Sequence, residues 1–436
     1  MQITMKQIDT EVGRRTDELL GFIMDLVRIP TVNQPPCGDE AAGQHFLANA
    51  LKNLGFIIDI FDCTDVEGFE RHPLYWPGIE LKGRPNMVAT WRGTGGGRSL
   101  LFSSHMDVCP AVPMPWEKGD PFVPYVEGGK LFGRGAGDMK GGMAAAFMAI
   151  RILHDLGFSP RGDIIFESVV DEEFAGANGT LACRLRGYKA DLCINPEPTN
   201  MVICPATLGA KIFRITVPGT AGMPYTGQLL YNPVFALGKV INILRQFETV
   251  WNQRFEDDPR FRDRRIPLNA ILWQVKAGEL APQEQMGTPK DAWVSVAVQT
   301  PPGVSEEEFD AVFNDFFWRS VRNDPEIAEH RPLVEKTYRY MHTADTPFSH
   351  PAVKAVSHAF EETTGKPPKV GVAPFSCDLF LFQRCKSGPA ICFGPRSENL
   401  HAAEECVHIE DVVALTKIFA RLIVTWTGQR KEEKAK

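Results

Sequence analysis

Histidine and carboxylate side chains recur in five short segments that lie far apart in the chain. The segments read S-S-H-M-D, G-R-G-A-G-D-M-K-G-G, V-V-D-E-E, N-P-E-P-T and L-H-A-A-E-E, and their candidate functional residues are His105, Asp107, Asp138, Glu172, Glu173, Glu197 and His401. Imidazole nitrogen and carboxylate oxygen together suit zinc, cobalt or manganese. Three carboxylates and two imidazoles would complete the ligand shell of two adjacent divalent ions, and one glutamate would remain free.

Such a centre predicts hydrolysis of an amide bond. Two ions that share a water lower its pKa from about 15.7 towards roughly 7, and they also polarise a carbonyl oxygen. A free glutamate beside them can take the proton of the water and pass it to the leaving nitrogen. The expected reaction therefore needs no covalent intermediate with the protein.

The positions of these residues in the predicted fold favour a shared site. Apolar runs at 99–104, 163–170 and 190–194 are typical of buried strands, and a polar segment follows each run. Open α/β sheets place their ligand sites at this carboxyl end of the strands. Because His105 and Asp107 are two residues apart and share a face, Asp107 can orient His105.

Each segment taken alone has an ordinary structural explanation. An H-x-D pair after a strand is more often structural than metal-binding, and D-E-E at a strand end is usually a solvated turn. The glycine-dense loop around Asp138 opens an alanine-rich helix and could cradle a phosphate, but it lacks the Lys-Ser/Thr pair of a nucleotide loop. The conjunction of all the segments at one end of a sheet is what indicates a metal centre.

The same segments resemble a known family of co-catalytic zinc metallopeptidases. This family includes carboxypeptidase G, acetylornithine deacetylase, succinyl-diaminopimelate desuccinylase and aminoacylase. The resemblance covers nearly the whole chain and also includes L-V-R-I-P-T-V-N near the start and F-G-P-R ahead of His401.

The resemblance implies a role for each candidate residue. Two sets of three ligands share one bridging carboxylate, and these sets are His105, Asp138 and Glu197 for one ion and Asp138, Glu173 and His401 for the other. Glu172 would be the general base and Asp107 the residue that orients His105. The residues alone leave open which glutamate of the D-E-E segment is the base, and only the resemblance chooses between them.

The chain departs from the family at a histidine of the smaller domain. In relatives this histidine helps to stabilise the oxyanion, whereas Met223 stands at its place here. Methionine cannot donate a hydrogen bond, and loss of one oxyanion donor costs about 100–1000-fold in rate. Either Tyr225 or another donor replaces it, or the substrate does not need it, or the chain is an engineered or degenerate variant. A further alternative is that a loop shift of a few residues hides the equivalent donor.

Alternating strand and helix patterns predict an α/β fold, with a mixed-sheet catalytic domain that has helices on both faces. Its expected strands are 56–61, 87–92, 99–104, 163–170 and 190–194, and its expected helices are 8–28, 40–54 and 140–157. A strand–helix–strand–strand–helix pattern follows from about Leu208 and predicts an inserted α+β sandwich. The expected domains are 1–207 plus 336–436 for catalysis, and 208–335 for a lid and dimerisation domain.

Composition excludes several other classes of protein. The 436 residues are 44% hydrophobic and 23% charged, as in a globular protein. The net charge of −7 argues against a nucleic-acid partner, and no apolar stretch is long enough for a membrane span. Ten cysteines without framework spacing indicate a reducing compartment, so we expect a cytoplasmic location.

The sequence therefore predicts a two-metal amidohydrolase that acts on a small N-acyl amino acid or peptide-like molecule. Zinc is the expected metal, with cobalt or manganese as alternatives, and the resemblance implies a homodimer formed through the inserted domain. One alternative is hydrolysis of another C–N bond, by deamination of an aryl amine or cleavage of a carbamoyl or ureido group. A second alternative is a non-catalytic binding protein on the same fold.

Overall fold

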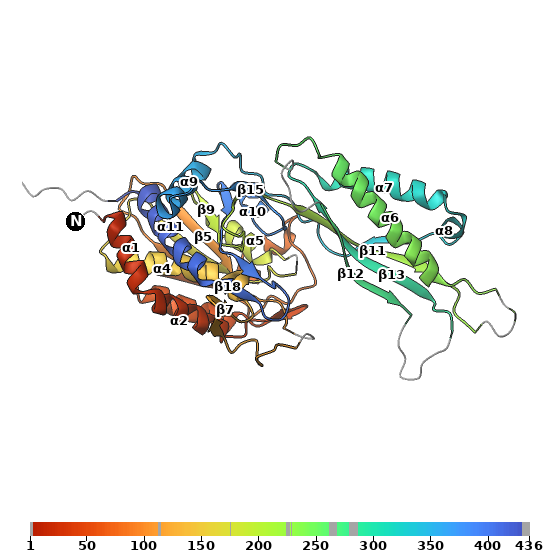
Figure 1. Cartoon of the computed structure of the whole chain (residues 1–436), viewed down its shortest axis with the longest axis horizontal. Helices are drawn as coiled ribbons and strands as arrows, with labels where there is room; N and C mark the ends of the chain where they lie inside the picture. Colours follow the sequence, from red (N-terminus) through yellow and green to blue (C-terminus); the bar gives the residue numbers. More distant parts are fainter. Residues whose placement is uncertain are drawn as a thin grey trace, which may run out of the picture. The chain divides into compact units, whose positions relative to one another are not determined.

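The computed structural model describes residues 3–111, 115–174, 176–223, 227, 229–260, 268–278 and 287–429. Contacts within the chain divide it into two compact units (Figure 1). Unit 1 comprises Met1–Ala206, Ala344–Ala373 and Cys377–Lys436, and unit 2 comprises Thr207–Thr343 and Pro374–Ser376. Unit 2 is thus inserted in the sequence of unit 1.

An eight-stranded mixed sheet lies at the centre of unit 1, in the order β15-β10-β16-β9-β5-β8-β4-β3. Strands β16, β9, β5 and β8 run parallel to one another, whereas β4 is antiparallel to β8 and β3 is antiparallel to β4. The strands are β3 Ile57–Asp62, β4 Pro85–Trp91, β5 Leu100–His105, β8 Ile164–Val169, β9 Cys193–Asn195, β10 Ile203–Thr207, β15 Val370–Ala373 and β16 Ala390–Cys392.

Long helices pack on one face of this sheet. They are α1 Met5–Arg14, α2 Thr16–Val27, α3 Ala41–Lys52, α4 Gly141–Asp155, α9 Pro351–Thr364 and α11 Ile409–Thr427. Helix α11 packs against α4 and α9, and α4 and α11 lie side by side in Figure 1. The buried side chains of these helices and of the sheet form one continuous apolar core.

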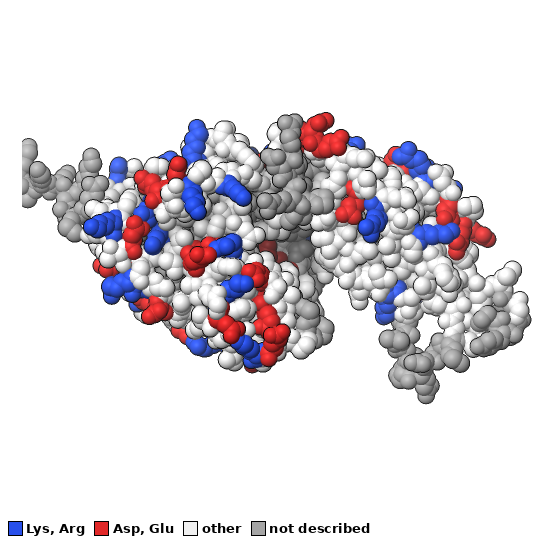
Figure 2. Space-filling model, viewed as in Figure 1, with Lys and Arg blue, Asp and Glu red and all other residues white. Residues whose placement is uncertain are grey.

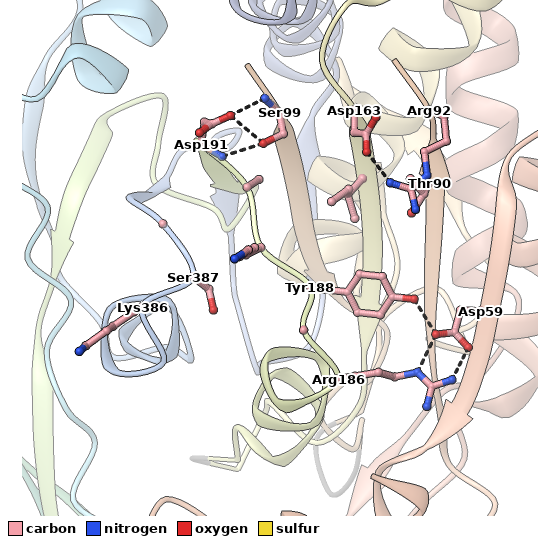
Figure 3. Close-up of a pocket in the computed structure, with 15 residues that line it drawn as sticks. Asp59, Thr90, Arg92, Ser99, Asp163, Arg186, Tyr188, Asp191, Lys386 and Ser387 are labelled. Atoms are coloured by element: carbon pink, nitrogen blue, oxygen red, sulfur yellow. Dashed lines mark hydrogen bonds and ion pairs between the residues drawn. The ribbon is translucent and has the colours of Figure 1, made fainter. Parts of the chain in front are cut away.

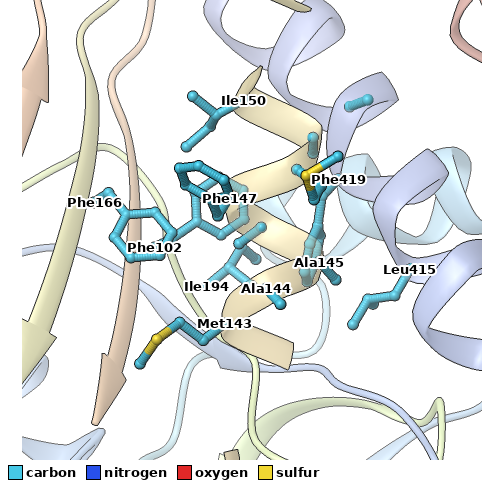
Figure 4. Close-up of a cluster of buried hydrophobic side chains, with 14 of the residues drawn as sticks. Phe102, Met143, Ala144, Ala145, Phe147, Ile150, Phe166, Ile194, Leu415 and Phe419 are labelled. Atoms are coloured by element: carbon cyan, nitrogen blue, oxygen red, sulfur yellow. The ribbon is translucent and has the colours of Figure 1, made fainter. Parts of the chain in front are cut away.

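Aromatic side chains fill the middle of this core (Figure 4). Phe102 of β5 and Phe166 of β8 are fully buried, and so are Phe147 of α4 and Phe419 of α11. The rings of Phe102 and Phe419 pack edge to face with centroids 5.1 Å apart. Burial of each such side chain stabilises the fold by about 1.5–3 kcal/mol, so the core holds the central strands firmly in place.

The opposite face of the sheet carries a buried polar network. Helices α5 (Asn178–Leu185) and α10 (Phe380–Arg384) pack against each other beside this face, and α5 also contacts β8. Arg184 of α5 forms a buried ion pair with Glu167 of β8, which also accepts a hydrogen bond from Ser103 at 2.6 Å. Helices therefore cover both faces of the mixed sheet, and the predicted fold class is confirmed.

A small antiparallel sheet joins distant parts of unit 1. Its order is β17-β18-β7-β6, with β6 Tyr125–Glu127, β7 Lys130–Phe132, β17 Ser397–Glu398 and β18 Cys406–His408. Because β18 pairs with β7, the segment between β17 and β18 lies next to the glycine-rich loop that follows β7. A two-stranded ladder, β1 Asn33–Gln34 with β2 Cys37–Gly38, lies nearer the start of the chain.

Unit 2 is a four-stranded antiparallel sheet covered by helices. The strands, in the order β12-β13-β11-β14, are β11 Gly209–Pro218, β12 Ala270–Ala277, β13 Asp291–Thr300 and β14 Leu333–Lys336, and the helices are α6 Pro233–Gln253, α7 Glu306–Arg322 and α8 Pro325–Glu329. The side chain of Phe213 on β11 packs against α7, with its ring centroid 4.8 Å from that of Phe313. The edge strand β12 is exposed over most of its length.

One predicted helix is wrong. The segment 8–28 is expected to be a single helix, but the chain breaks at Arg15, where α1 ends and α2 begins. The Arg15 guanidinium donates hydrogen bonds to Glu18 and Asp155 at 2.6 Å each. The break is invisible in the sequence because the apolar faces of both helices continue the same pattern.

The surface carries charges of both signs. On the face of unit 1 drawn in Figure 2, Lys and Arg side chains are interspersed with Asp and Glu. Among the described residues, no helix combines the length and apolar character that crossing a membrane requires.

Candidate metal centre

Parallel strands bring most of the predicted site residues to one edge of the large sheet. His105 is the last residue of β5, Glu172 and Glu173 follow β8, and Glu197 follows β9. Strand β5 pairs in parallel with both β8 and β9, so the carboxyl ends of all three strands meet. Open α/β sheets place their ligands at this carboxyl end of the strands.

The buried His105 ring is oriented by a main-chain oxygen. Its Nδ1 lies 2.9 Å from the carbonyl oxygen of Asp107, to which it can donate, while the nearer carboxylate oxygen of Asp107 lies 3.6 Å away. A donating Nδ1 leaves the lone pair on Nε2 free for a ligand. Nε2 lies 3.0 Å from Asp138 Oδ1 and 3.4 Å from Glu197 Oε1, so the three predicted ligands of one ion lie together.

The Asp107 carboxylate organises the segment that carries the two glutamates. Its Oδ2 accepts hydrogen bonds from the backbone N–H groups of Glu172 at 2.9 Å and Glu173 at 3.0 Å, and from Asn33 Nδ2 at 2.8 Å. Asp171 has a φ of 62°, which turns the chain sharply after β8. Asp107 therefore fixes both the ring of His105 and the direction in which the glutamates leave the strand.

The two oxygens of Asp138 contact different imidazoles. Oδ1 lies 3.0 Å from His105 Nε2, and Oδ2 lies 3.3 Å from His401 Nε2. His401 Nε2 also lies 2.9 Å from Glu173 Oε2. The three residues predicted for the second ion therefore also lie together, and Asp138 belongs to both sets.

Glu405 holds the two loops of this centre together, and sequence reasoning did not single it out. Its carboxylate accepts hydrogen bonds from the backbone N–H groups of Gly135 at 3.1 Å, Gly137 at 2.9 Å and Asp138 at 3.0 Å. It also forms a buried ion pair with Arg134 at 2.5 Å. Glu405 thus ties the segment that carries His401 to the loop that carries Asp138. The only signal in the sequence is its place in L-H-A-A-E-E.

A buried lysine anchors the same loop on its other side. Lys140 Nζ donates to the carbonyl oxygens of Leu26 and Ile29, each at 3.0 Å, at the end of α2. Burial lowers the pKa of Lys140 to about 7. Together with Glu405, this contact holds the loop around Asp138 from two directions.

The remaining glutamate of the D-E-E segment faces the His105 side of the centre. The donor atoms of Glu172, His105 and Glu197 all lie within 4.8 Å of one another. Burial raises the pKa of Glu172 well above its usual value of 4.5. A buried carboxyl with a raised pKa suits a group that exchanges protons near neutral pH.

The other site residues shift the pKa values of one another strongly. Burial lowers the pKa of His105, but the charge of Glu197 and the hydrogen bond to Asp138 outweigh it and raise that pKa well above 6.5. Burial and the charge of Asp138 raise the pKa of Glu197 to about 8. Hydrogen bonds to Asp138, Cys109 and Glu173 raise the pKa of His401. Burial raises the pKa of Asp138, but hydrogen bonds from both histidines outweigh it and lower that pKa.

These residues fit a pair of divalent ions. Among the described residues, neither a lysine nor an arginine forms an ion pair with Asp138, Glu173 or Glu197, although all three carboxylates are close together. Clustered carboxylates without a cation repel one another, and cations at the two His–carboxylate sets would relieve this repulsion. The donor types are those of zinc, cobalt and manganese sites.

A pocket of about 710 Å³ lies at the opposite ends of the same strands (Figure 3). Ser99, Asp163 and Asp191, which precede β5, β8 and β9, contribute to its lining. Asp163 pairs with Arg92, Asp59 pairs with Arg186, and Asp191 accepts a hydrogen bond from Ser99. The predicted metal ligands lie at the other ends of these strands, away from this pocket.

The sequence of the chain matches peptidase family M20/M25/M40 over residues 101–425. It is 26% identical to an N-formyl-4-amino-5-aminomethyl-2-methylpyrimidine deformylase of Bacillus subtilis, over 98% of both chains. It is 28% identical to a succinyl-diaminopimelate desuccinylase of Methylobacterium radiotolerans, over 93% of this chain and 96% of that one. The fold is similar to that of the dipeptidase Dug1p from Saccharomyces cerevisiae, with a TM-score of 0.77, 13% identity and coverage of 98% and 99%.

The chain belongs to peptidase family M20/M25/M40. It is a metal-dependent hydrolase that acts on amide C–N bonds. The predicted family and the predicted class of enzyme are both confirmed.

Met223 lies in unit 2 and is 37% exposed. It follows Gly222, whose backbone exchanges hydrogen bonds with Thr288 at 2.8 and 3.3 Å. Its thioether donates no hydrogen bond. Tyr225, which we considered as a replacement donor, lies outside the described residues.

Proposed function

We propose that the protein is a two-metal hydrolase that cleaves an amide C–N bond in a small N-acyl amino acid or peptide-like substrate. One observation supports this most strongly: the two oxygens of Asp138 contact two different imidazoles. His105, Asp138 and Glu197 hold one ion, and Asp138, Glu173 and His401 hold the other. A carboxylate that offers one oxygen to each ion is the ligand that two adjacent ions require.

The residues around the ions divide the work of hydrolysis. When bound, the ions supply Lewis acidity and make a water molecule easier to deprotonate at neutral pH. Glu172 accepts a proton from the attacking water and delivers it to the leaving nitrogen as the C–N bond breaks and the C–O bond forms. Asp107 keeps Nε2 of His105 directed at the centre and fixes the backbone of Glu172.

Zinc is the metal that we propose for both positions. Nitrogen and oxygen ligands in a small, largely buried cluster suit zinc, while cobalt and manganese accept the same donors. Elemental analysis of protein purified without added metal distinguishes the three.

We propose that the protein forms a homodimer through unit 2. The strand β12 lies at an edge of its sheet and exposes Ile271, Trp273 and Val275, each by more than 40%. On α6, Phe235 is 73% exposed. An unprotected apolar edge strand is a site at which another chain adds to a sheet. The resemblance to the family is our ground for proposing a lid role for unit 2 as well.

We also propose a cytoplasmic location. All ten cysteines are free thiols, and most of them are buried. Proteins of oxidising compartments commonly pair their cysteines, so free thiols support a reducing environment.

Two observations bear on the class of substrate. Met223 cannot replace a hydrogen-bond donor, so a substrate that does not need that donor is favoured. The curated deformylase relative carries a name that describes removal of a formyl group from an aminomethylpyrimidine, which is not a peptide. Hydrolysis of a non-peptide C–N bond, including a ureido or carbamoyl group, is therefore the second candidate.

Replacement of Glu172 by glutamine tests the proposed role of the base. We expect a loss of about 100–10,000-fold in kcat with two ions still bound, because only proton transfer is removed. The substrate panel should contain N-formyl amines, N-succinyl amino acids, dipeptides and ureido acids. Glu127→Gln, an exposed glutamate on β6, is the matched control and should keep wild-type activity. Full activity of Glu172→Gln would refute the assignment.

A further inference from the structure

His401 differs from the other predicted ligands because it lies on an exposed loop. Its side chain is 51% exposed, whereas that of Asp138 is 15% exposed and that of Glu173 is 3% exposed. We call residues 399–405 the His401 loop, which lies between the two-residue strand β17 and the three-residue strand β18. Packing restrains a half-exposed ring only weakly, so other contacts must hold this imidazole in place.

The backbone of the His401 loop adopts a conformation that needs support from its surroundings. Asn399, His401 and Glu404 have φ angles of 57°, 59° and 58°. Residues other than glycine rarely adopt such angles, because Cβ crowds the following carbonyl oxygen, and they keep them only where neighbouring contacts fix them. The Asn399 amide donates to the carbonyl oxygen of Glu404 at 3.1 Å, and Ala402 N–H donates to that of Asn399 at 2.9 Å. These two contacts close the loop on itself and do not attach it to another element.

The Glu404 carboxylate attaches the His401 loop to a segment much earlier in the chain. Its Oε2 accepts a hydrogen bond from the Tyr125 hydroxyl at 2.7 Å, and its Oε1 accepts one from the backbone N–H of Glu117 at 2.6 Å. The neighbouring Glu405 binds the glycine-rich loop of Asp138 instead. The two adjacent glutamates therefore connect the His401 loop to two different elements.

The side chain of Tyr125 is itself held firmly. Tyr125 lies on β6 opposite Phe132 of β7, and the two rings stack with centroids 4.8 Å apart and planes 4° from parallel. Lys118 Nζ lies over the Tyr125 ring, 4.6 Å from its centroid. Strand β7 also pairs with β18, which follows the His401 loop. The hydroxyl is thus offered from a fixed ring to a loop that depends on fixed contacts.

We propose that Tyr125 is a positioning residue: its hydroxyl acts through Glu404 to hold His401 at the position of the second metal ion. This inference rests on the proposed two-metal function and deepens it. A ligand that is held in place beforehand loses less conformational freedom when an ion binds, so the contact raises the affinity for that ion. The first ion has no ligand on the His401 loop, and its affinity does not depend on Tyr125.

The competing role for this contact is stabilisation of the fold alone. A partly exposed hydrogen bond stabilises a fold only modestly. A contact with that role would alter the urea midpoint of the metal-free protein and leave both zinc dissociation constants of the folded protein unchanged. A positioning contact raises one of these constants and not the other.

Zinc titration of the full-length protein against a competing chelator separates the two roles. Tyr125→Phe keeps the ring and removes only the hydroxyl oxygen, and we expect it to raise one dissociation constant about 10-fold and leave the other unchanged. Tyr188→Phe is the matched control, because it also removes a hydroxyl that donates to a carboxylate, that of Asp59 at 2.5 Å, at the opposite ends of the strands. This control should leave both constants unchanged.

A double variant tests whether Tyr125 acts through Glu404. Glu404→Ala removes the acceptor of both contacts and should raise the same dissociation constant about 10–100-fold. The double variant Tyr125→Phe/Glu404→Ala should bind zinc as weakly as Glu404→Ala and no more weakly. Two effects that add in the double variant would overturn the proposed route through Glu404.

Anomalous diffraction from crystals of Tyr125→Phe at limiting zinc identifies the weakened position. The zinc peak beside His401 should lose occupancy, and the peak beside His105 should keep it. Loss at both peaks, at neither peak or only beside His105 would overturn the positioning role.

The failures of the two proposals are distinguishable. Unchanged dissociation constants in Tyr125→Phe, with two ions bound to the wild type, would overturn the role of Tyr125 and leave the two-metal function standing. Fewer than two ions in fully loaded wild-type protein would overturn both. Urea denaturation of the metal-free variants shows whether they fold, and Tyr125→Phe and Glu404→Ala each test the positioning of His401 without the other.

Discussion

Replacing Glu405 by alanine should weaken unit 1 severely. The carboxylate accepts three backbone N–H groups of the glycine-rich loop and pairs with Arg134, and both side chains are almost fully buried. Breaking a buried ion pair costs about 3–5 kcal/mol, because the remaining charge is left without a partner. Each abandoned N–H adds a desolvation cost of about 1–3 kcal/mol where water cannot reach it. We therefore expect a loss of about 5 kcal/mol or more.

Urea denaturation of the metal-free protein, monitored by circular dichroism, measures this loss. Glu405→Gln keeps one carbonyl oxygen as an acceptor but removes the charge of the carboxylate. Its free energy of unfolding should fall by about 2–3 kcal/mol, because the charge-assisted hydrogen bonds are lost. The control is Asp25→Ala, which removes an exposed ion pair with Arg28 and should change stability by less than about 1 kcal/mol. If Glu405→Ala unfolds within about 1 kcal/mol of the wild type, the view that this carboxylate holds the loop in place is refuted.

Three further predictions concern metal, pH and assembly. Loading metal-free protein with zinc at 100 times its dissociation constant should stabilise unit 1 by about 2.7 kcal/mol per ion. Calorimetry should show a rise in Tm of about 4 °C per ion, and an unchanged Tm would contradict zinc binding to the folded centre. Burial raises the pKa of Asp59, but hydrogen bonds from Arg186 and Tyr188 outweigh it and lower that pKa below 3.8. The stability that such a carboxyl contributes is present above its unfolded pKa and is lost as pH falls through its folded pKa. Asp59→Asn should therefore flatten the fall of the urea midpoint between about pH 4 and pH 2. An unaltered pH profile would count against this role of Asp59. Trp273→Glu on β12 should convert the proposed dimer to a monomer in light scattering, and a dimer of unchanged stability would place the interface elsewhere.

Continuous apolar runs were sufficient to predict the central strands. The run at 99–104 became β5 (Leu100–His105), and the run at 163–170 became β8 (Ile164–Val169). Both strands are buried along their whole length, so each begins with consecutive apolar residues and not with an alternating pattern. The helix at 140–157 was equally clear, because an alanine-rich segment suits both helix formation and close packing.

The short strands of unit 1 could not be predicted in the same way. Strands β7 and β18 have three residues each, which is too few to show a period. Their pairing is what brings the His401 segment to the loop of Asp138, so the geometry of the centre depends on elements that the sequence does not reveal.

The missed residue of the site, Glu405, has the same explanation. It acts through contacts with residues far away in the sequence, such as the backbone N–H of Asp138. Residue type and local spacing carry no record of such contacts. Three of the candidate ligands, in contrast, closely follow predicted strands, where their type alone suggests chemistry, and these are His105, Glu173 and Glu197.

Anomalous diffraction from zinc-loaded crystals tests the central claim most directly. The account predicts two zinc peaks, one bound by His105, Asp138 and Glu197 and the other by Asp138, Glu173 and His401, with Asp138 contacting both. A single peak, or a second peak that does not contact Asp138, would contradict it.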